Sequence, residues 1–129
     1  MTVTAIPGGT PVELPPWELK PPAGVNWLFH STVAGTNQLG RQRVASDCET
    51  GDILTLEAEP TNAADPNAIR VLRNGRQLGY LKRHVAAEIA REGWPVDSLV
   101  AAVTDMVEGD DGDETKPYII VNILLGRRQ

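Results

Sequence analysis

The chain has 129 residues, of which 41% are hydrophobic, enough for one domain with a single core and too few for two. Its formal net charge of −5 argues against a protein that binds polyanions through bulk positive charge. The single cysteine, Cys48, excludes an internal disulfide and a cysteine-based metal site, and it suits a reducing compartment. No apolar run approaches the ~20 residues that cross a bilayer, and no export signal is evident. We therefore expect a cytoplasmic protein without a membrane partner.

The first part of the chain is rich in proline. Residues 1–26 hold six of the ten prolines and show no hydrophobic period. Because each proline removes a backbone donor and fixes φ, we predict a proline-rich extended arm over residues 1–26. The stretch from Pro15 to Pro22 has two interpretations. It can dock onto a protein partner in polyproline II form, or Trp17 and Leu19 can pack against the domain's own surface.

From Trp27 the pattern changes to short strands. Residues 27–34 are rich in aromatic and β-branched side chains, which favours a strand. Residues 53–59 alternate, with Leu54, Leu56 and Ala58 on one face, as in a half-buried strand. The dipeptide Asn74-Gly75 separates strand-like runs over 68–73 and 76–81. Since both of its residues can take positive φ, it predicts a hairpin with a type I′ turn.

A helix and two further strands complete the pattern. Residues 83–92 contain good helix formers and place four apolar side chains on one stripe, which are Val85, Ala86, Ile89 and Ala90. Gly93 ends this helix. Strands are expected over 99–107 and 118–125, with an acidic segment between them. We predict a mainly β domain over residues 27–129, a small OB-like or modified β-barrel with one or two short helices.

Neither catalytic nor metal-binding motifs are found. The two histidines, His30 and His84, lie in no recognisable nucleophile, zinc or phosphate-loop pattern, so we expect no enzyme activity and no cofactor. The acidic run at residues 108–114 lacks the alternating ligand spacing of a calcium loop. It is therefore interpreted as a solvated hairpin loop.

Positive charge gathers around the predicted hairpin. Residues 70–84 contain no carboxylate and five basic side chains, which are Arg70, Arg73, Arg76, Lys82 and Arg83. Arg41 and Arg43 could join them from an upstream loop. Such a set can bind phosphate groups. It can equally be an ordinary solvated rim paired with Glu57, Glu59 and Glu88, and composition does not decide between the two.

The segment Asp65-Pro66-Asn67 is typical of a turn, because Asp and Asn side chains bond to nearby backbone while Pro presets φ. An Asp in a short loop beside arginines could also accept a hydrogen bond from a hydroxyl group of a ligand. Both roles can hold together.

Several motifs occur in the order in which one known family carries them. They are Val33-Ala34-Gly35, Gly40-Arg41-Gln42, residues 51–56, the run EPTNAADPNAIRV at residues 59–71, and Leu78-Gly79-Tyr80-Leu81. Over about residues 29–125 the chain resembles the HIRAN domain. The resemblance implies a modified OB-like barrel, found in helicase-like fork-remodelling enzymes and as stand-alone bacterial proteins. The best-studied members grip the 3′ end of single-stranded DNA.

The resemblance also implies site residues. Asp65 matches the family Asp that accepts the terminal 3′-hydroxyl, and Asn62 matches a pocket Asn. Arg83 stands for a backbone-contacting Lys, Tyr80 for a pocket His, and Arg41 for the Arg of an Arg-Tyr-Tyr run. The family tyrosines are replaced, and the residues in their places are Gln42, Arg43 and Ala64. Aromatic stacking contributes ~1–3 kcal/mol per base, so these replacements weaken end capture.

Together these observations predict a non-catalytic module that recognises single-stranded DNA ends with a 3′-hydroxyl, in DNA repair or at replication forks. The predicted nucleic-acid-binding residues are Arg41, Arg43, Asn62, Asp65, Tyr80, Lys82 and Arg83. The alternative is a protein-interaction module that docks onto a nuclease or helicase, through the barrel or through residues 1–26, with a vestigial DNA pocket.

Overall fold

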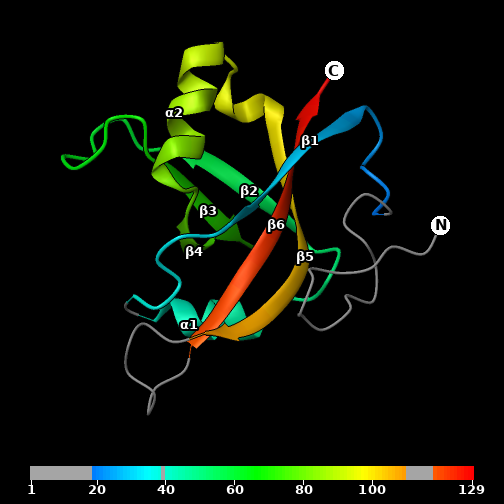
Figure 1. Ribbon diagram of the computed structural model, residues 1–129, viewed down its shortest axis with the longest axis vertical. Coiled ribbons are helices and arrows are strands. Elements are labelled where there is room, and N and C mark those ends of the chain that lie inside the picture. Colours follow the sequence, from blue (N-terminus) through cyan, green and yellow to red (C-terminus); the bar gives the residue numbers. More distant parts are fainter. Residues whose placement is uncertain (1–18, 39, 110–117) are drawn as a thin grey trace.

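A computed structural model describes residues 19–38, 40–109 and 118–129. Within these ranges the chain forms one curled antiparallel sheet of six strands, with the order β1-β6-β5-β2-β3-β4, and a few short helices (Figure 1). The strands are β1 (Val25–Thr32), β2 (Ile53–Ala58), β3 (Ile69–Arg73), β4 (Arg76–Tyr80), β5 (Leu99–Gly109) and β6 (Tyr118–Arg128). The helices are α1 (Arg41–Ser46), α2 (Arg83–Glu92) and the 3₁₀ turn η2 (Val96–Ser98). This architecture confirms the predicted mainly β, OB-like class.

The longest strands form the middle of the sheet. β5 and β6 pair along their whole length, from Leu99 opposite Arg127 to Gly109 opposite Tyr118. A register shift between Val103 and Asp105 bends the pair, as β-bulges do. The inward-facing side chains of these strands form the core together with residues from every other strand or its flanking segment and from both helices. The concave side of the curled sheet is therefore filled by side chains.

The hairpin between β3 and β4 has the predicted turn. Asn74 has φ 51° and Gly75 has φ 78°, so both central residues are left-handed, as a type I′ turn requires. A register shift between Val71 and Leu72 adds curvature to this small sheet edge.

The two edges of the sheet meet at a single bridge. Ala34 lies two residues after β1, and its backbone N–H and carbonyl pair with those of Tyr80 at 2.8 and 2.9 Å. Tyr80 is the last residue of β4, at the opposite edge. The approach is close, because a Cβ added at Gly79 would lie 2.3 Å from the carbonyl oxygen of Ala34. Glycine at position 79 is thus required by contact and not by φ.

Helix α2 occupies the predicted range and ends at Gly93, whose φ is 72°. Val85, Ala86 and Ile89 are buried as expected, but Ala90 is exposed, so its assignment to the buried stripe was wrong. The buried stripe of α2 is narrower than predicted because only the side of the helix that carries Val85, Ala86 and Ile89 faces the sheet. Ala58 is likewise exposed, because it lies at the end of β2, where the strand leaves the core.

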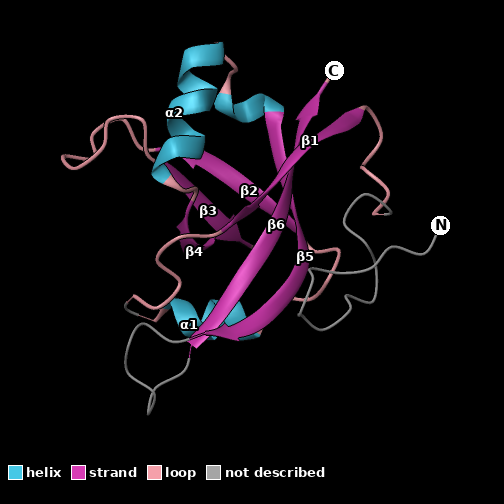
Figure 2. Ribbon diagram, viewed as in Figure 1, coloured by secondary structure: helices cyan, strands magenta, loops and turns pink. Residues whose placement is uncertain are grey.

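The segment expected to be a loop at Arg41 and Arg43 is helical. Helix α1 begins after Gly40, whose φ of 71° turns the chain into it, and Val44 and Ala45 anchor it in the core. Both helices contribute to the same core and lie at opposite ends of the curled sheet (Figure 2).

Two predicted segments fall partly outside the described residues. Of the predicted arm over residues 1–26, residues 1–18 lie outside, and Val25 and Asn26 pair with β6 as the first residues of β1. Of the acidic run, residues 110–114 lie outside, and Glu108 and Gly109 end β5. No helix in the described ranges is long and apolar enough to cross a membrane.

Candidate nucleic-acid interface

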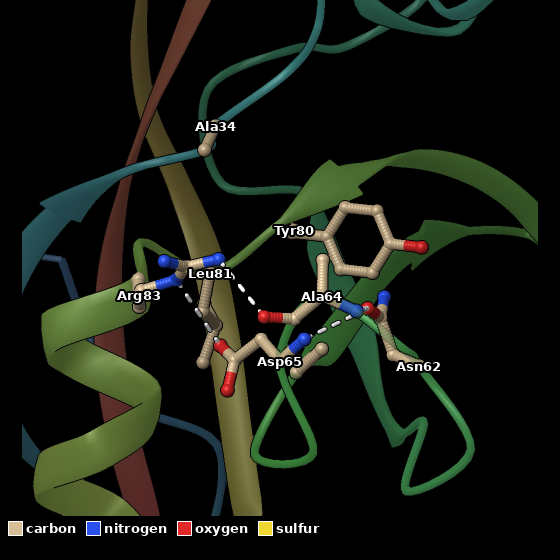
Figure 3. A pocket seen from close by; sticks show the side chains of 8 residues that line it. Ala34, Asn62, Ala64, Asp65, Tyr80, Leu81 and Arg83 are labelled. Carbon is tan, nitrogen blue, oxygen red and sulfur yellow. Dashed lines mark hydrogen bonds and ion pairs between the residues drawn. The ribbon is translucent and has the colours of Figure 1, made fainter.

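A surface pocket of about 220 Å³ lies where the loop after β2, the end of β4 and the start of α2 meet (Figure 3). Its lining residues are Ala34, Asn62, Ala64, Asp65, Ala68, Tyr80, Leu81 and Arg83. Four of the seven predicted site residues are among them. The walls are mostly apolar, since three alanines, Leu81 and the Tyr80 ring contribute to them, and the polar groups are few, as in a specific ligand site.

The loop that carries Asn62 and Asp65 is held by its own side chains. Asn62 Oδ1 accepts hydrogen bonds from the backbone N–H groups of Ala64 and Asp65 at 2.9 and 3.0 Å. Asp65 Oδ1 accepts one from the N–H of Asn67 at 3.0 Å. The predicted turn chemistry of this segment is therefore present, and it fixes the position of the Asp65 carboxylate.

The second carboxylate oxygen of Asp65 faces Arg83. Asp65 Oδ2 lies 3.9 Å from Arg83 Nε, and Arg83 Nη2 donates to the carbonyl oxygen of Ala64 at 3.1 Å. The Asp65 side chain is 17% exposed, whereas that of Arg83 is 74% exposed. A loose pair of this kind leaves Asp65 Oδ2 able to accept a hydrogen bond from a ligand and leaves much of the guanidinium in solvent.

Tyr80 is fixed at both ends of its side chain. Its hydroxyl donates to Glu59 Oε1 at 2.8 Å, and the guanidinium carbon of Arg41 lies 5.4 Å from its ring centroid. This distance is within the range of a cation–π contact. Arg41 also donates to the carbonyl oxygen of Gly35 at 3.0 Å. Arg41 therefore contacts a wall of the pocket through the Tyr80 ring, although it does not line the space.

Glu59 is a site residue that the sequence did not reveal. Its Oε1 also accepts a hydrogen bond from Asn62 Nδ2 at 2.8 Å, and its Oε2 lies 3.5 Å from Arg70 Nε. The Tyr80 hydroxyl and then the Asn62 amide hold the pKa of this carboxyl below its ordinary value. One carboxylate thus joins two pocket side chains. Its place in the Glu59-to-Val71 run was the only available signal.

The basic hairpin is largely neutralised by carboxylates. Arg70 pairs with Glu57 and Glu59, Arg73 Nε lies 3.0 Å from Asp52, and Arg76 Nη1 lies 3.4 Å from Asp47. These three arginines therefore form an ordinary paired rim. The expected partner Glu88 instead pairs with Arg91 on α2. Arg43 and Lys82 are exposed and lie outside the pocket lining.

Gln42, expected from the resemblance to stand in place of a tyrosine, is a structural anchor. Its Nε2 donates to the carbonyl oxygens of Thr36 and Ile119 at 2.9 and 3.0 Å, and its Oε1 accepts from the N–H of Ile119. The Gln42 side chain therefore links α1 to β6 and is directed into the domain. Among the described residues, no group of three or more His, Cys, Asp or Glu side chains is placed to hold a metal ion.

The HIRAN domain family model matches residues 28–119, which is most of the chain. The chain belongs to the HIRAN domain family. HIRAN domains are binding domains, and the family is associated with DNA binding. Membership agrees with the motif order in the sequence and with the curled OB-like sheet.

Similar proteins include the helicase-like transcription factors of Mus musculus and Oryctolagus cuniculus, each 39% identical to this HIRAN chain over 57 residues. That alignment covers 43% of the chain and 5% of each relative. A Lactobacillus plantarum protein of known structure is similar with a TM-score of 0.53 and 22% identity, over 78% of this chain and 95% of that one. The HIRAN domain of human HLTF gives a TM-score of 0.43 at 21% identity, over 81% and 77% of the two chains. At these identities the likeness to the Lactobacillus protein concerns the fold alone.

Proposed function

We propose that this HIRAN domain is a non-catalytic module that captures the 3′ end of single-stranded DNA in the pocket beside Tyr80. The observation that carries the proposal is that Asn62, Asp65, Tyr80 and Arg83 line one pocket. They come from three separate parts of the chain, and each matches a ligand-contacting position of the family. If these residues served some purpose other than ligand binding, their four side chains would not need to line the same pocket.

The chemistry of each group fits a terminal nucleotide. Asp65 Oδ2 accepts the hydrogen bond of the 3′-hydroxyl, and a carboxylate acceptor makes this bond stronger than a neutral one. The Tyr80 ring supplies a surface for the last base. Arg83 and the neighbouring Lys82 contact the phosphates, with Arg43 as a more distant cation. A 3′-phosphate would bring further negative charge beside Asp65, so a blocked end is disfavoured.

The proposal places the module in DNA repair or at replication forks. Two relatives bear the name helicase-like transcription factor, which supports a role beside a helicase-like protein. The alignment covers only 5% of each of those proteins, so the role of the whole relative does not transfer to this chain. A helicase-like partner is therefore also part of the proposal.

The test is fluorescence anisotropy with labelled oligonucleotides that end in a 3′-hydroxyl or a 3′-phosphate. We expect tighter binding to the 3′-hydroxyl end. Asp65→Asn should weaken that binding roughly ten- to hundredfold, because a hydrogen bond to a charged group is worth about 1.5–3 kcal/mol. It should also abolish the difference between the two ends.

Asp97→Asn is the matched control, since Asp97 is exposed in η2 and outside the pocket lining. It should leave both affinities unchanged. Equal affinity of the unsubstituted chain for both ends, or no measurable affinity for either, would reject end recognition.

A further inference from the structure

The sheet has an apolar outer face that points away from the core. Val100, Ala102 and Leu124 lie on it, because the sequence neighbours on each side of Ala102 and Leu124 belong to the core cluster and side chains alternate along a strand. The register puts Leu124 opposite both His30 and Ala102, and Ala102 opposite Ile53. This line of side chains crosses β1, β6, β5 and β2.

A second line runs beside the first. Gly126 lies opposite Trp27 on one side and Val100 on the other. The Trp27 ring covers Gly126 closely, since a Cβ at that position would be 2.7 Å from a ring carbon. Trp27 therefore lies flat on the outer face and forms one wall of an apolar strip.

The centre of this strip is covered. Val100 and Ala102 are each 2% exposed and Leu124 is 5% exposed, whereas Ile53, at the margin of the same face, is 52% exposed. The buried side chains of α1 and α2 all belong to the core cluster on the opposite face. The helices therefore do not cover this strip.

The chain enters the described region at this strip. The Trp27 indole Nε1 donates to the carbonyl oxygen of Leu19 at 2.6 Å. Between them, the N–H of Val25 bonds to the carbonyl oxygen of Pro22 at 3.0 Å, and Gly24 has φ 78°, so the chain turns back on itself before β1. Residues 19–24 therefore lie beside the start of β1. This returning segment is drawn in dark blue in Figure 1.

We propose that residues 1–18 dock on this outer face and cover Val100, Ala102 and Leu124. The segment is apolar enough for the purpose, since it carries Val3, Ile6, Val12, Leu14 and Trp17 and contains no lysine or arginine. Four of its residues are prolines. Proline has no N–H to leave unsatisfied, so such a segment can cross a sheet face without adding a strand.

The length of the segment is sufficient. A polyproline II chain rises about 3.1 Å per residue, so eighteen residues reach roughly 56 Å. The strip spans four strands at about 4.8 Å spacing, or roughly 15 Å. Trp17 and Leu14 lie within a few residues of Leu19, and they are therefore the side chains that fill the line through Leu124 and Ala102. In this arrangement the proline-rich arm is occupied by its own domain and is not free for a partner.

The test uses the full chain with a nitroxide spin label on Thr10→Cys and amide NMR spectra. Cys48 is buried and burial raises the pKa of its thiol, so the unsubstituted chain should take up no label and serves as the labelling control. We expect strong loss of amide intensity at Ile53, Ala102 and Leu124, and none at Ala64 or Asp65 in the pocket loop. A second substitution, Trp17→Asp, should restore the lost intensity without changing the dispersion of the other signals.

Val3→Asp is the matched charge control, and it should leave the intensity loss in place. Loss spread evenly over the surface, loss centred on the pocket, or no loss at all would overturn the proposal. Mixing spin-labelled, NMR-silent chains with unlabelled isotope-enriched chains detects docking on a second copy, and intensity loss in that mixture would also overturn it.

Discussion

At the scale of single residues, the pocket depends on one carboxylate that does not line it. Glu59 accepts hydrogen bonds from Tyr80 and Asn62 with the same oxygen and pairs with Arg70 through the other. Its charge is therefore used to orient one ring and one amide. Residues whose rotamers are locked in this way supply a preorganised site, which lowers the entropic cost of binding.

Glu59→Gln should weaken binding of the 3′-hydroxyl oligonucleotide, because a neutral amide orients Tyr80 and Asn62 less firmly. It should also change the pH dependence of stability. The folded-state pKa of Glu59 is depressed, so its contribution to the free energy of unfolding is complete above about pH 4.5 and is lost as the pH falls through the lower folded value. The urea midpoints of the two chains should therefore differ at neutral pH and converge in acid.

Glu57→Gln is the matched control for this prediction. Glu57 pairs with the same Arg70 but contacts neither Tyr80 nor Asn62 in any described interaction. It should leave oligonucleotide affinity unchanged. A gap between the urea midpoints of the Glu59→Gln and unsubstituted chains that stays constant from neutral pH to acid would contradict the assigned role.

Single residues also show what the sequence could and could not predict. The family motif led to Asn62, Asp65, Tyr80 and Arg83, and these do meet in one pocket. It did not lead to Glu59, because strand alternation predicts only an outward side chain there. The paired state of Arg73 was equally hidden, since Asp52 is twenty-one positions away and only the fold brings the two together.

At the scale of elements, the bridge between Ala34 and Tyr80 joins the two edges of the sheet. Gly79 permits it, because a Cβ at this position would collide with the carbonyl oxygen of Ala34, one of the two groups that form the bridge. The same strand end carries the Tyr80 side chain into the pocket. Closure of the sheet and formation of the site therefore depend on one short contact.

Gly79→Ala should destabilise the fold by about 1–3 kcal/mol, in the range of overpacking substitutions, and should weaken oligonucleotide binding as well. Gly109→Ala is the matched control, since the atom nearest its added Cβ is the flexible end of Ile120. Urea unfolding and anisotropy on both chains check the prediction. Equal effects of the two substitutions would show that the close approach at Gly79 is unimportant.

Elements with a strong local sequence pattern could be predicted, and an element without one could not. The Asn74-Gly75 turn and helix α2 follow from turn chemistry and an apolar stripe, and both are present. Helix α1 was missed because six residues are too few to show a helical period, and its formation depends on burial of Val44 and Ala45. Tertiary packing decided that element.

At the scale of the whole molecule, a chain with net charge −5 presents few unpaired cations to DNA. Arg70, Arg73 and Arg76 are engaged with carboxylates. The cations near the pocket are Arg41, which contacts the Tyr80 ring, Lys82 and the largely exposed Arg83. Bulk electrostatics should therefore contribute little, and recognition should depend on the pocket.

The salt dependence of oligonucleotide binding should consequently be shallow. Lys82→Ala should reduce the slope of log affinity against log salt by about 0.7, the value for one phosphate contact with a single strand. Arg76→Ala, which removes a paired cation, should leave the slope unchanged. Titrations at several salt concentrations check this, and an equal reduction by both variants would indicate that the hairpin rim also contacts phosphate.

Tyr80 links ligand binding in the pocket to the joining of the two sheet edges. Its backbone pairs with Ala34 while its side chain forms a wall of the pocket, so a molecule in which that pairing opens has no complete site. The apparent affinity of any ligand is then scaled by the fraction of molecules in which the edges are joined. By reciprocity, a bound strand end holds the edges together. The ratio of the dissociation constants of the Gly79→Ala and unsubstituted chains would thus measure by what factor the substitution lowers the fraction of molecules with joined edges.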